Sequence, residues 1–132
     1  MAKAKKVAQL KVKTGNKVGV LSNLTAALKS TGIDIFHLCA YGMDNEAYFM
    51  IVLSNPEKAH DALKSAGYEV TQDSVLEVEF ESAAGTLEPV AKKIADAGID
   101  ILYIYGTTSD GSKVVGVVST QDNDKALGVI NA

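Results

Sequence analysis

The chain has 132 residues, of which 47% are hydrophobic and 22% charged, and its formal net charge is −3. This composition is typical of a soluble globular protein and argues against intrinsic disorder. A negative net charge disfavours a general nucleic-acid or anionic-membrane surface, because such surfaces need clustered positive charge. We therefore expect no nucleic-acid partner. The sequence contains no recognisable signal peptide and no run long enough for a membrane span, so we expect no membrane partner either.

The cysteine and arginine contents restrict the chemistry further. Cys39 is the only cysteine, which excludes an intrachain disulfide and a cysteine-rich zinc site and favours a cytoplasmic location. All thirteen basic residues are lysines, so the bidentate grip of arginine on phosphate or carboxylate is absent. His37 and His60 have no further ligand at metal spacing. No combination of nucleophile, base and orienting group emerges, and we predict a protein that is not an enzyme and holds no metal or cofactor.

The first half of the chain follows a β-α-β-β-α-β order. Alternating apolar residues predict a strand over 8–12, and helical periodicity predicts a helix over 20–31 that ends at Gly32. In the turn between them, Asn16 is predicted to cap the helix, and Gly19 leaves its first N–H groups accessible. The remaining predicted elements are a hairpin over 33–41 and 47–53, a helix over 56–66 and a short strand over 68–71.

The same order returns 66 positions later. Gly85 repeats Gly19, and Gly98-Ile-Asp-Ile101 repeats Gly32-Ile-Asp-Ile35 at the same offset. We therefore divide the chain into a first unit, residues 1–72, and a second unit, residues 73–132. The second unit lacks a fourth strand of its own, which leaves an unpaired sheet edge. A strand from the other unit or from a second chain could fill that edge, or it could stay exposed. The predicted elements of the second unit are a strand over 76–80, a helix over 86–97, a hairpin over 99–105 and 113–119, and a helix over 122–130.

The β-α-β-β-α-β order predicts an α+β fold of two ferredoxin-like units, each an antiparallel sheet with helices on one face. The turn Asn16-Lys-Val-Gly19-Val-Leu21, followed by Gly32-Ile-Asp-Ile35, resembles the ACT domain, a small regulatory module of amino-acid metabolism. The second copy resembles it too, so the resemblance to a stand-alone tandem ACT-domain protein covers residues 7–130.

The resemblance implies that ACT units pair side by side and bind an amino acid at the seam, between the first turn of one unit and the second strand of the other. Ser82 stands where the family favours Asp or Asn, so the second of the two implied sites is expected to be the weaker. The first site would use Asn16, Lys17, Val18, Gly19 and Val20 with Ile99, Asp100 and Ile101. The second would use Ser82, Ala84, Gly85 and Thr86 with Ile33, Asp34 and Ile35.

Each of these residues also has a purely structural interpretation. Asn16 can be a helix cap without a ligand, Gly19 a turn glycine, and Asp34 a turn cap. The function that the resemblance implies is a non-catalytic regulatory protein that binds a small amino acid between its units. The alternative is an assembly or regulatory subunit of a metabolic enzyme with no ligand of its own. A homodimer is expected in either case. Lys11 and Lys13 on the first strand correspond to Glu77 and Glu79 in its repeat, and we expect these faces to meet, within or between chains, and to help set the register of the dimer.

Overall fold

The computed structural model describes residues 2–81, 84–108 and 110–132, which form two compact units. The first unit comprises Ala8–Asp73, and the second comprises residues 2–7 together with Ser74–Ala132. The segment before Ala8 therefore belongs to the second unit, although it directly precedes the first unit in the sequence.

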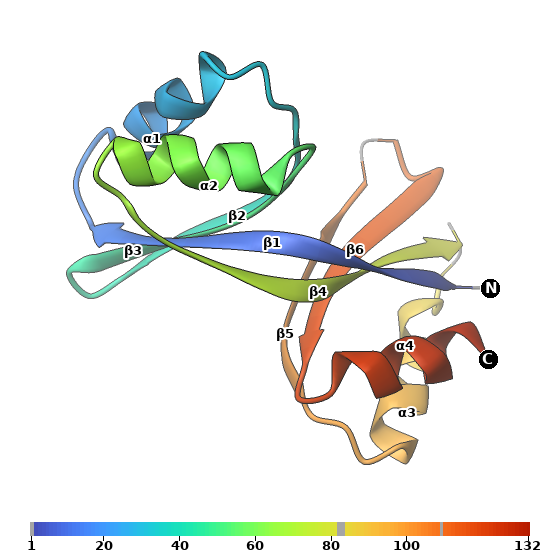
Figure 1. Ribbon diagram of the computed structural model, residues 1–132. Helices are drawn as coiled ribbons and strands as arrows, with labels where there is room; N and C mark the ends of the chain where they lie inside the picture. The colour runs from blue at the N-terminus through green and yellow to red at the C-terminus, as the bar shows by residue number, and fades with distance from the viewer. Residues whose placement is uncertain (1, 82–83, 109) are drawn as a thin grey trace. The chain divides into compact units, whose positions relative to one another are not determined.

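The elements confirm the α+β fold of two ferredoxin-like units (Figure 1). The first unit has the order β-α-β-β-α-β, and the second has the order β-α-β-β-α along the chain. The strand order is β2-β3-β1-β4 in the first unit and β5-β6-β4-β1 in the second. β3 is antiparallel to both β1 and β2, and β6 is antiparallel to both β4 and β5. The elements are β1 (Lys3–Gly15), α1 (Val20–Lys29), β2 (Ile35–Met43), β3 (Glu46–Leu53), α2 (Pro56–Ser65), β4 (Glu69–Glu81), α3 (Leu87–Asp96), β5 (Ile101–Thr107), β6 (Lys113–Thr120) and α4 (Asn123–Asn131).

β1 and β4 are each long enough to serve both units. Each has 13 residues, about twice the usual length of a strand. The first part of β1 supplies the missing fourth strand of the second unit, where Ala2 and Ala4 pack against the core. β4 is correspondingly one continuous strand, whereas the sequence predicted two. The open edge of the second unit is thus filled from within the chain.

Alternation along the strands places one apolar row under the helices of each unit. In the first unit, Leu10 and Val12 of β1 and Ile51 of β3 are buried with Leu24 of α1 and Leu63 of α2. Side chains of this kind contribute about 1.5–3 kcal/mol each on full burial. The core of the second unit is built in the same way and includes Leu76, Val78, Ile94, Val118 and Ile130.

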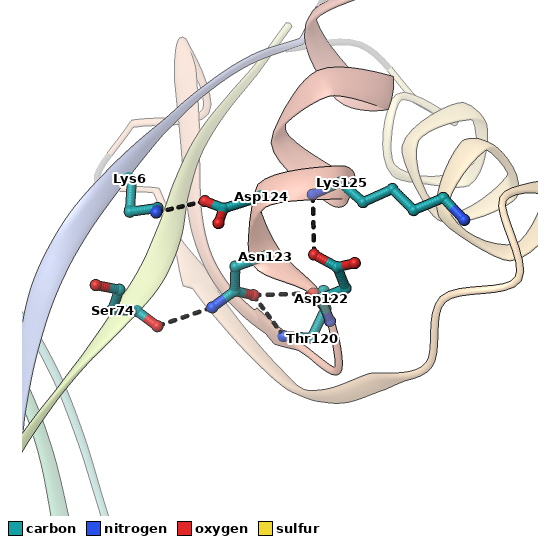
Figure 2. Close-up of polar contacts among 7 residues, drawn as sticks. All are labelled: Lys6, Ser74, Thr120, Asp122, Asn123, Asp124 and Lys125. Carbon is teal, nitrogen blue, oxygen red and sulfur yellow. Dashed lines mark hydrogen bonds and ion pairs between the residues drawn. The ribbon is translucent and has the colours of Figure 1, made fainter.

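The start of α4 fastens the two shared strands to the second unit (Figure 2). The Asn123 side chain donates to the Ser74 carbonyl of β4 at 2.8 Å and accepts from the Thr120 N–H at 2.8 Å. Beside it, the Asp124 carboxylate forms an ion pair with Lys6 of β1. Lys6 and Ser74 both belong to the second unit, close to the residues at which β1 and β4 continue into the first unit. The start of α4 therefore anchors the second-unit parts of both strands.

The other end of α4 holds the outer edge of β1. The Ala4 N–H donates to Asn131 Oδ1 at 2.8 Å, and Asn131 Nδ2 donates to the Ala4 carbonyl at 2.9 Å. One side-chain amide thereby meets a donor and an acceptor of the edge strand, much as a neighbouring strand would.

Lys5 and Lys11 of β1 form ion pairs within their own units. Lys11 Nζ lies 3.4 Å from Asp73 Oδ2, and Lys5 Nζ lies 3.4 Å from Glu77 Oε1. These pairs join β1 to β4. Some of the charges that suggested a homodimer therefore form ion pairs within the chain.

Candidate functional site

The turn between β1 and α1 brings together the five residues predicted for half of the first site. Gly19 is the N-cap of α1 and adopts φ 91°, a left-handed conformation that favours glycine. The Gly19 carbonyl accepts the first helical bond, from Asn23 N–H at 3.0 Å. Val20 begins the helix and packs on the core, whereas Val18 is fully exposed. The first N–H groups of a helix lack intrahelical acceptors, so this turn can bind an anion.

Asn16 does not cap the helix, contrary to the sequence prediction. A capping side chain must lie directly before the first helical residue to reach the N–H groups of the first turn, and Gly19 occupies that position with no side-chain cap. Asn16 instead donates its backbone N–H to the Asn45 carbonyl at 2.8 Å. Its side-chain amide lies across Gly42 of β2, where an added Cβ would stand 2.7 Å from Nδ2. The turn is therefore held by the end of the β2–β3 hairpin.

A shallow hollow of about 300 Å³, largely open to solvent and called the cavity below, lies between this turn and the hairpin. Its walls include Asn16 and Lys17 of the turn, and its floor includes Ala47 and Phe49 of β3. The volume lies at the lower end of the range for small-molecule sites. A cationic lysine, helix N–H groups and an apolar floor are suited to a small ligand with one anionic end.

A charged cluster next to the cavity fixes the same hairpin to β1. Lys13 Nζ lies 3.0 Å from Glu46 Oε2, and the Tyr48 hydroxyl donates to that oxygen at 2.8 Å. The hydrogen bond from Lys13, followed by that from Tyr48, lowers the pKa of Glu46. The same hydrogen bond raises the pKa of Lys13. Tyr41, which lines the cavity, stacks on Tyr48 with ring centroids 5.3 Å apart.

The Ile33-Asp-Ile35 segment, predicted for the second site, lies at the other end of α1. Asp34 exchanges backbone and side-chain hydrogen bonds with Ser54: its N–H donates to Ser54 Oγ at 3.1 Å, and its carbonyl accepts from Ser54 N–H at 3.0 Å. Ile33, Asp34 and Ile35 line a second hollow of about 540 Å³ together with Lys29. The Asp34 carboxylate is exposed there and remains a predicted ligand group.

The second unit repeats the glycine turn and the Gly-Ile-Asp-Ile segment, with differences in both. Ile99 is buried, Asp100 is exposed with its carbonyl accepting from Gln121 N–H at 2.9 Å, and Ile101 begins β5. Gly85 has φ 82° and is left-handed like Gly19, and Ala84 beside it is exposed. Thr86 caps α3 by position, but its hydroxyl donates to the Glu81 carbonyl at 3.0 Å rather than to the helix. Ser82 lies outside the described residues.

Each predicted site draws its two halves from different units, and the pairing of those halves stays a prediction. Sequence reasoning missed Gly42, Ala47 and Phe49, which line the cavity at the Asn16 turn, and Asn45, whose carbonyl accepts from the Asn16 N–H. The signal available was the hairpin turn at Asp44-Asn45, since it brings the ends of two strands to the end of β1.

Two absences hold for the part of the chain that the structure describes. Within it, no three His, Cys, Asp or Glu side chains gather where they could hold a metal ion. None of its helices is both long and apolar enough to cross a membrane.

Two ferredoxin-like units, each with a glycine turn before its first helix, define the class of tandem ferredoxin-like folds. A family model described as an ACT domain pair matches residues 5–132, and the chain belongs to this family. No protein with a curated description matches the sequence.

Solved structures share the fold over nearly the whole chain. The protein BT0572 from Bacteroides thetaiotaomicron is 25% identical, and the match covers 96% of this chain and 87% of that one with a TM-score of 0.89. The ligand-free regulatory subunit of aspartate kinase from Thermus thermophilus is 16% identical, with coverage of 93% and 89% and a TM-score of 0.68. The corresponding subunit from Thermus flavus is 17% identical, with coverage of 98% and 94% and a TM-score of 0.67. At these identities the two kinase subunits show the fold alone.

Proposed function

We propose that this chain is a non-catalytic regulatory protein that binds a small amino acid at the Asn16 turn. The observation that carries the proposal is the cavity of about 300 Å³, in which Lys17 and the start of α1 meet an apolar floor. The α-carboxylate would lie at the helix N-terminus, and the side chain on the floor. Micromolar to millimolar binding needs roughly 4–8 kcal/mol, which a few charge-assisted hydrogen bonds can supply.

The second half of the site, Ile99 to Ile101, would come from another copy of the chain. β2 pairs with β3 and β5 pairs with β6, so each is the outer strand of its unit, and the two are not neighbours in the strand order. A seam between β2 and β5 therefore needs two chains. In a homodimer, Asp100 of one copy would meet the ligand's ammonium at the Asn16 turn of the other. Ligand binding would then favour one assembled state, which a metabolic enzyme could sense.

Thermal shift measurements with each of the twenty amino acids test the binding. We expect one or a few of them to raise the melting temperature, and Gly19→Ala to abolish the rise. Because alanine at φ 91° is strained by about 1–2 kcal/mol, the variant needs a control with equal strain. Gly67→Ala provides it, since Gly67 has φ 93°, an added Cβ meets nothing within 4 Å at either position, and Gly67 lies outside the site. Loss of the shift in both variants, or no shift with any amino acid, would refute the proposal.

The outer strands support a second candidate function, that of an assembly subunit with no ligand. Neither Ile35–Met43 nor Ile101–Thr107 contains an Asp, Glu, Lys, Arg or Pro, the residues with which proteins usually protect sheet edges. Phe36 of β2 and Leu102 of β5 are 58% and 59% exposed. Sedimentation velocity without any amino acid distinguishes the two functions. Full association of the ligand-free chain, together with no thermal shift, favours the assembly subunit.

A further inference from the structure

The segment that carries Asp100 is held in place by residues at the start of α4. The Asp100 carbonyl accepts from the Gln121 N–H at 2.9 Å, directly before the helix cap. At the other end of the segment, Lys125 Nζ donates to the Ala97 carbonyl at 2.9 Å. Ala97 is the C-cap of α3, where a cation also complements the helix dipole. The backbone is therefore held on both sides of residues 98–99, whereas the Asp100 side chain is exposed.

The capping of α4 directs Lys125 toward this contact. The Asp122 carboxylate accepts from the Lys125 backbone N–H at 3.1 Å. Figure 2 shows the Lys125 side chain extending away from Asp122, and its ammonium group binds the Ala97 carbonyl. Lys125 is half-buried, so its aliphatic stem is restrained and the ammonium group stays near the end of α3.

The first unit contains the same arrangement. The Asp34 carbonyl accepts from the Ser54 N–H at 3.0 Å, and Lys58 Nζ donates to the Thr31 carbonyl at 3.0 Å. In both units the lysine stands four residues after the residue that binds the Asp carbonyl, and the carbonyl that it binds lies three residues before the Asp. Because the bond occurs in both copies, we attribute it to the fold rather than to one flexible side chain.

The arrangement bears on ligand binding because Asp100 is the group that would meet the ligand's ammonium. A carboxylate forms a strong charge-assisted hydrogen bond only when it is held at the right distance and direction. The direction of an exposed side chain depends on the backbone that carries it. Building on the proposed function, we propose that Lys125 positions Asp100 for the ammonium group of the bound amino acid. Lys125 acts through the backbone of the segment and not through contact with the ligand.

Nuclear magnetic resonance titration of the full chain with each of the twenty amino acids tests this, because the Gly19 amide lies in the Asn16 turn and reports binding there. We expect Lys125→Met to weaken that binding about fivefold. Lys125→Arg keeps a cationic donor and should retain most of the affinity. Lys58→Met is the matched control, since it removes the equivalent bond of 3.0 Å from the first unit, and it should leave the affinity at Gly19 unchanged. Methionine keeps the aliphatic stem and the helix propensity of lysine, so these variants should fold.

A second measurement separates positioning of Asp100 from a general loss of stability. If Lys125 acts through Asp100, Lys125→Met should weaken binding no further in a chain that already carries Asp100→Ala. Equal losses in the two backgrounds, equal losses in Lys125→Met and Lys58→Met, or wild-type affinity in Lys125→Met would overturn this inference and leave the proposed function standing. No response of the Gly19 amide to any of the twenty amino acids at millimolar concentration would overturn both.

Discussion

Removing the Asn131 side chain should loosen the first strand of the second unit without unfolding the chain. Asn131→Ala deletes two hydrogen bonds to the Ala4 backbone, of 2.8 and 2.9 Å. Each is worth about 0.5–1.5 kcal/mol net, and the lower end applies because both groups are exposed and water can replace the lost partner. Alanine also recovers about 0.5 kcal/mol of helix propensity in α4. The global change is therefore small, about 0.5 kcal/mol, whereas the local loss at Ala4 is about 1 kcal/mol.

Amide hydrogen exchange at Ala4 measures this local effect. A loss of about 1 kcal/mol should speed exchange there about fivefold. Asn55→Ala is the matched control in the first unit, since the Asn55 side chain accepts from Lys58 N–H at 3.2 Å. It should speed exchange at Lys58 and leave Ala4 unchanged. An Ala4 exchange rate in Asn131→Ala equal to that of the wild type would show that this amide does not hold the strand.

Three further outcomes are expected. Leu24→Ala, at a site with 0% exposure, should lower the unfolding free energy measured in urea by about 2–5 kcal/mol. Asn123→Ala removes the bond to the Ser74 carbonyl and the two part-buried bonds that Asn123 Oδ1 accepts from the Thr120 N–H and hydroxyl, and it should cost about 1–3 kcal/mol in the same assay. NMR titration should place the pKa of Glu46 below 4.5, and Lys13→Ala should raise it. Because that pKa is lowered, the contribution of Glu46 to stability is present above pH 4.5 and is lost as the pH falls through the lowered value. An unchanged pKa in Lys13→Ala would contradict this ion pair.

The order of elements could be predicted because local signals and the repeat agree. Gly32 and Gly98 both adopt φ 72° after their helices, as the Gly-Ile-Asp-Ile repeat indicates. The continuity of β4 could not, because Asp73 and Ser74 are typical turn residues in the middle of the segment. They are accommodated in the strand by distant partners, Lys11 for Asp73 and Asn123 for the Ser74 carbonyl. Such long-range contacts leave no trace in local sequence patterns.

The candidate site was predictable only in the part that depends on the backbone. A glycine in the turn before α1 could be expected from the sequence, and Gly19 there adopts φ 91°. The place of the Asn16 side chain does not, because it depends on Gly42, which reaches the turn only when β2 and β3 have paired.

The double use of β1 has a consequence for the order in which the chain folds during synthesis. Residues 8–73 contain every strand and helix that the first unit needs, so this unit can close soon after Asp73 has left the ribosome. Residues 3–7 are made earlier, yet their partners in α4 are made after every other element of the second unit. The second unit can therefore complete its sheet only after α4 has been synthesised. Until then residues 3–7 are exposed. Closing such a long loop is slow, and the unfinished sheet is open to a strand from another nascent chain in the meantime.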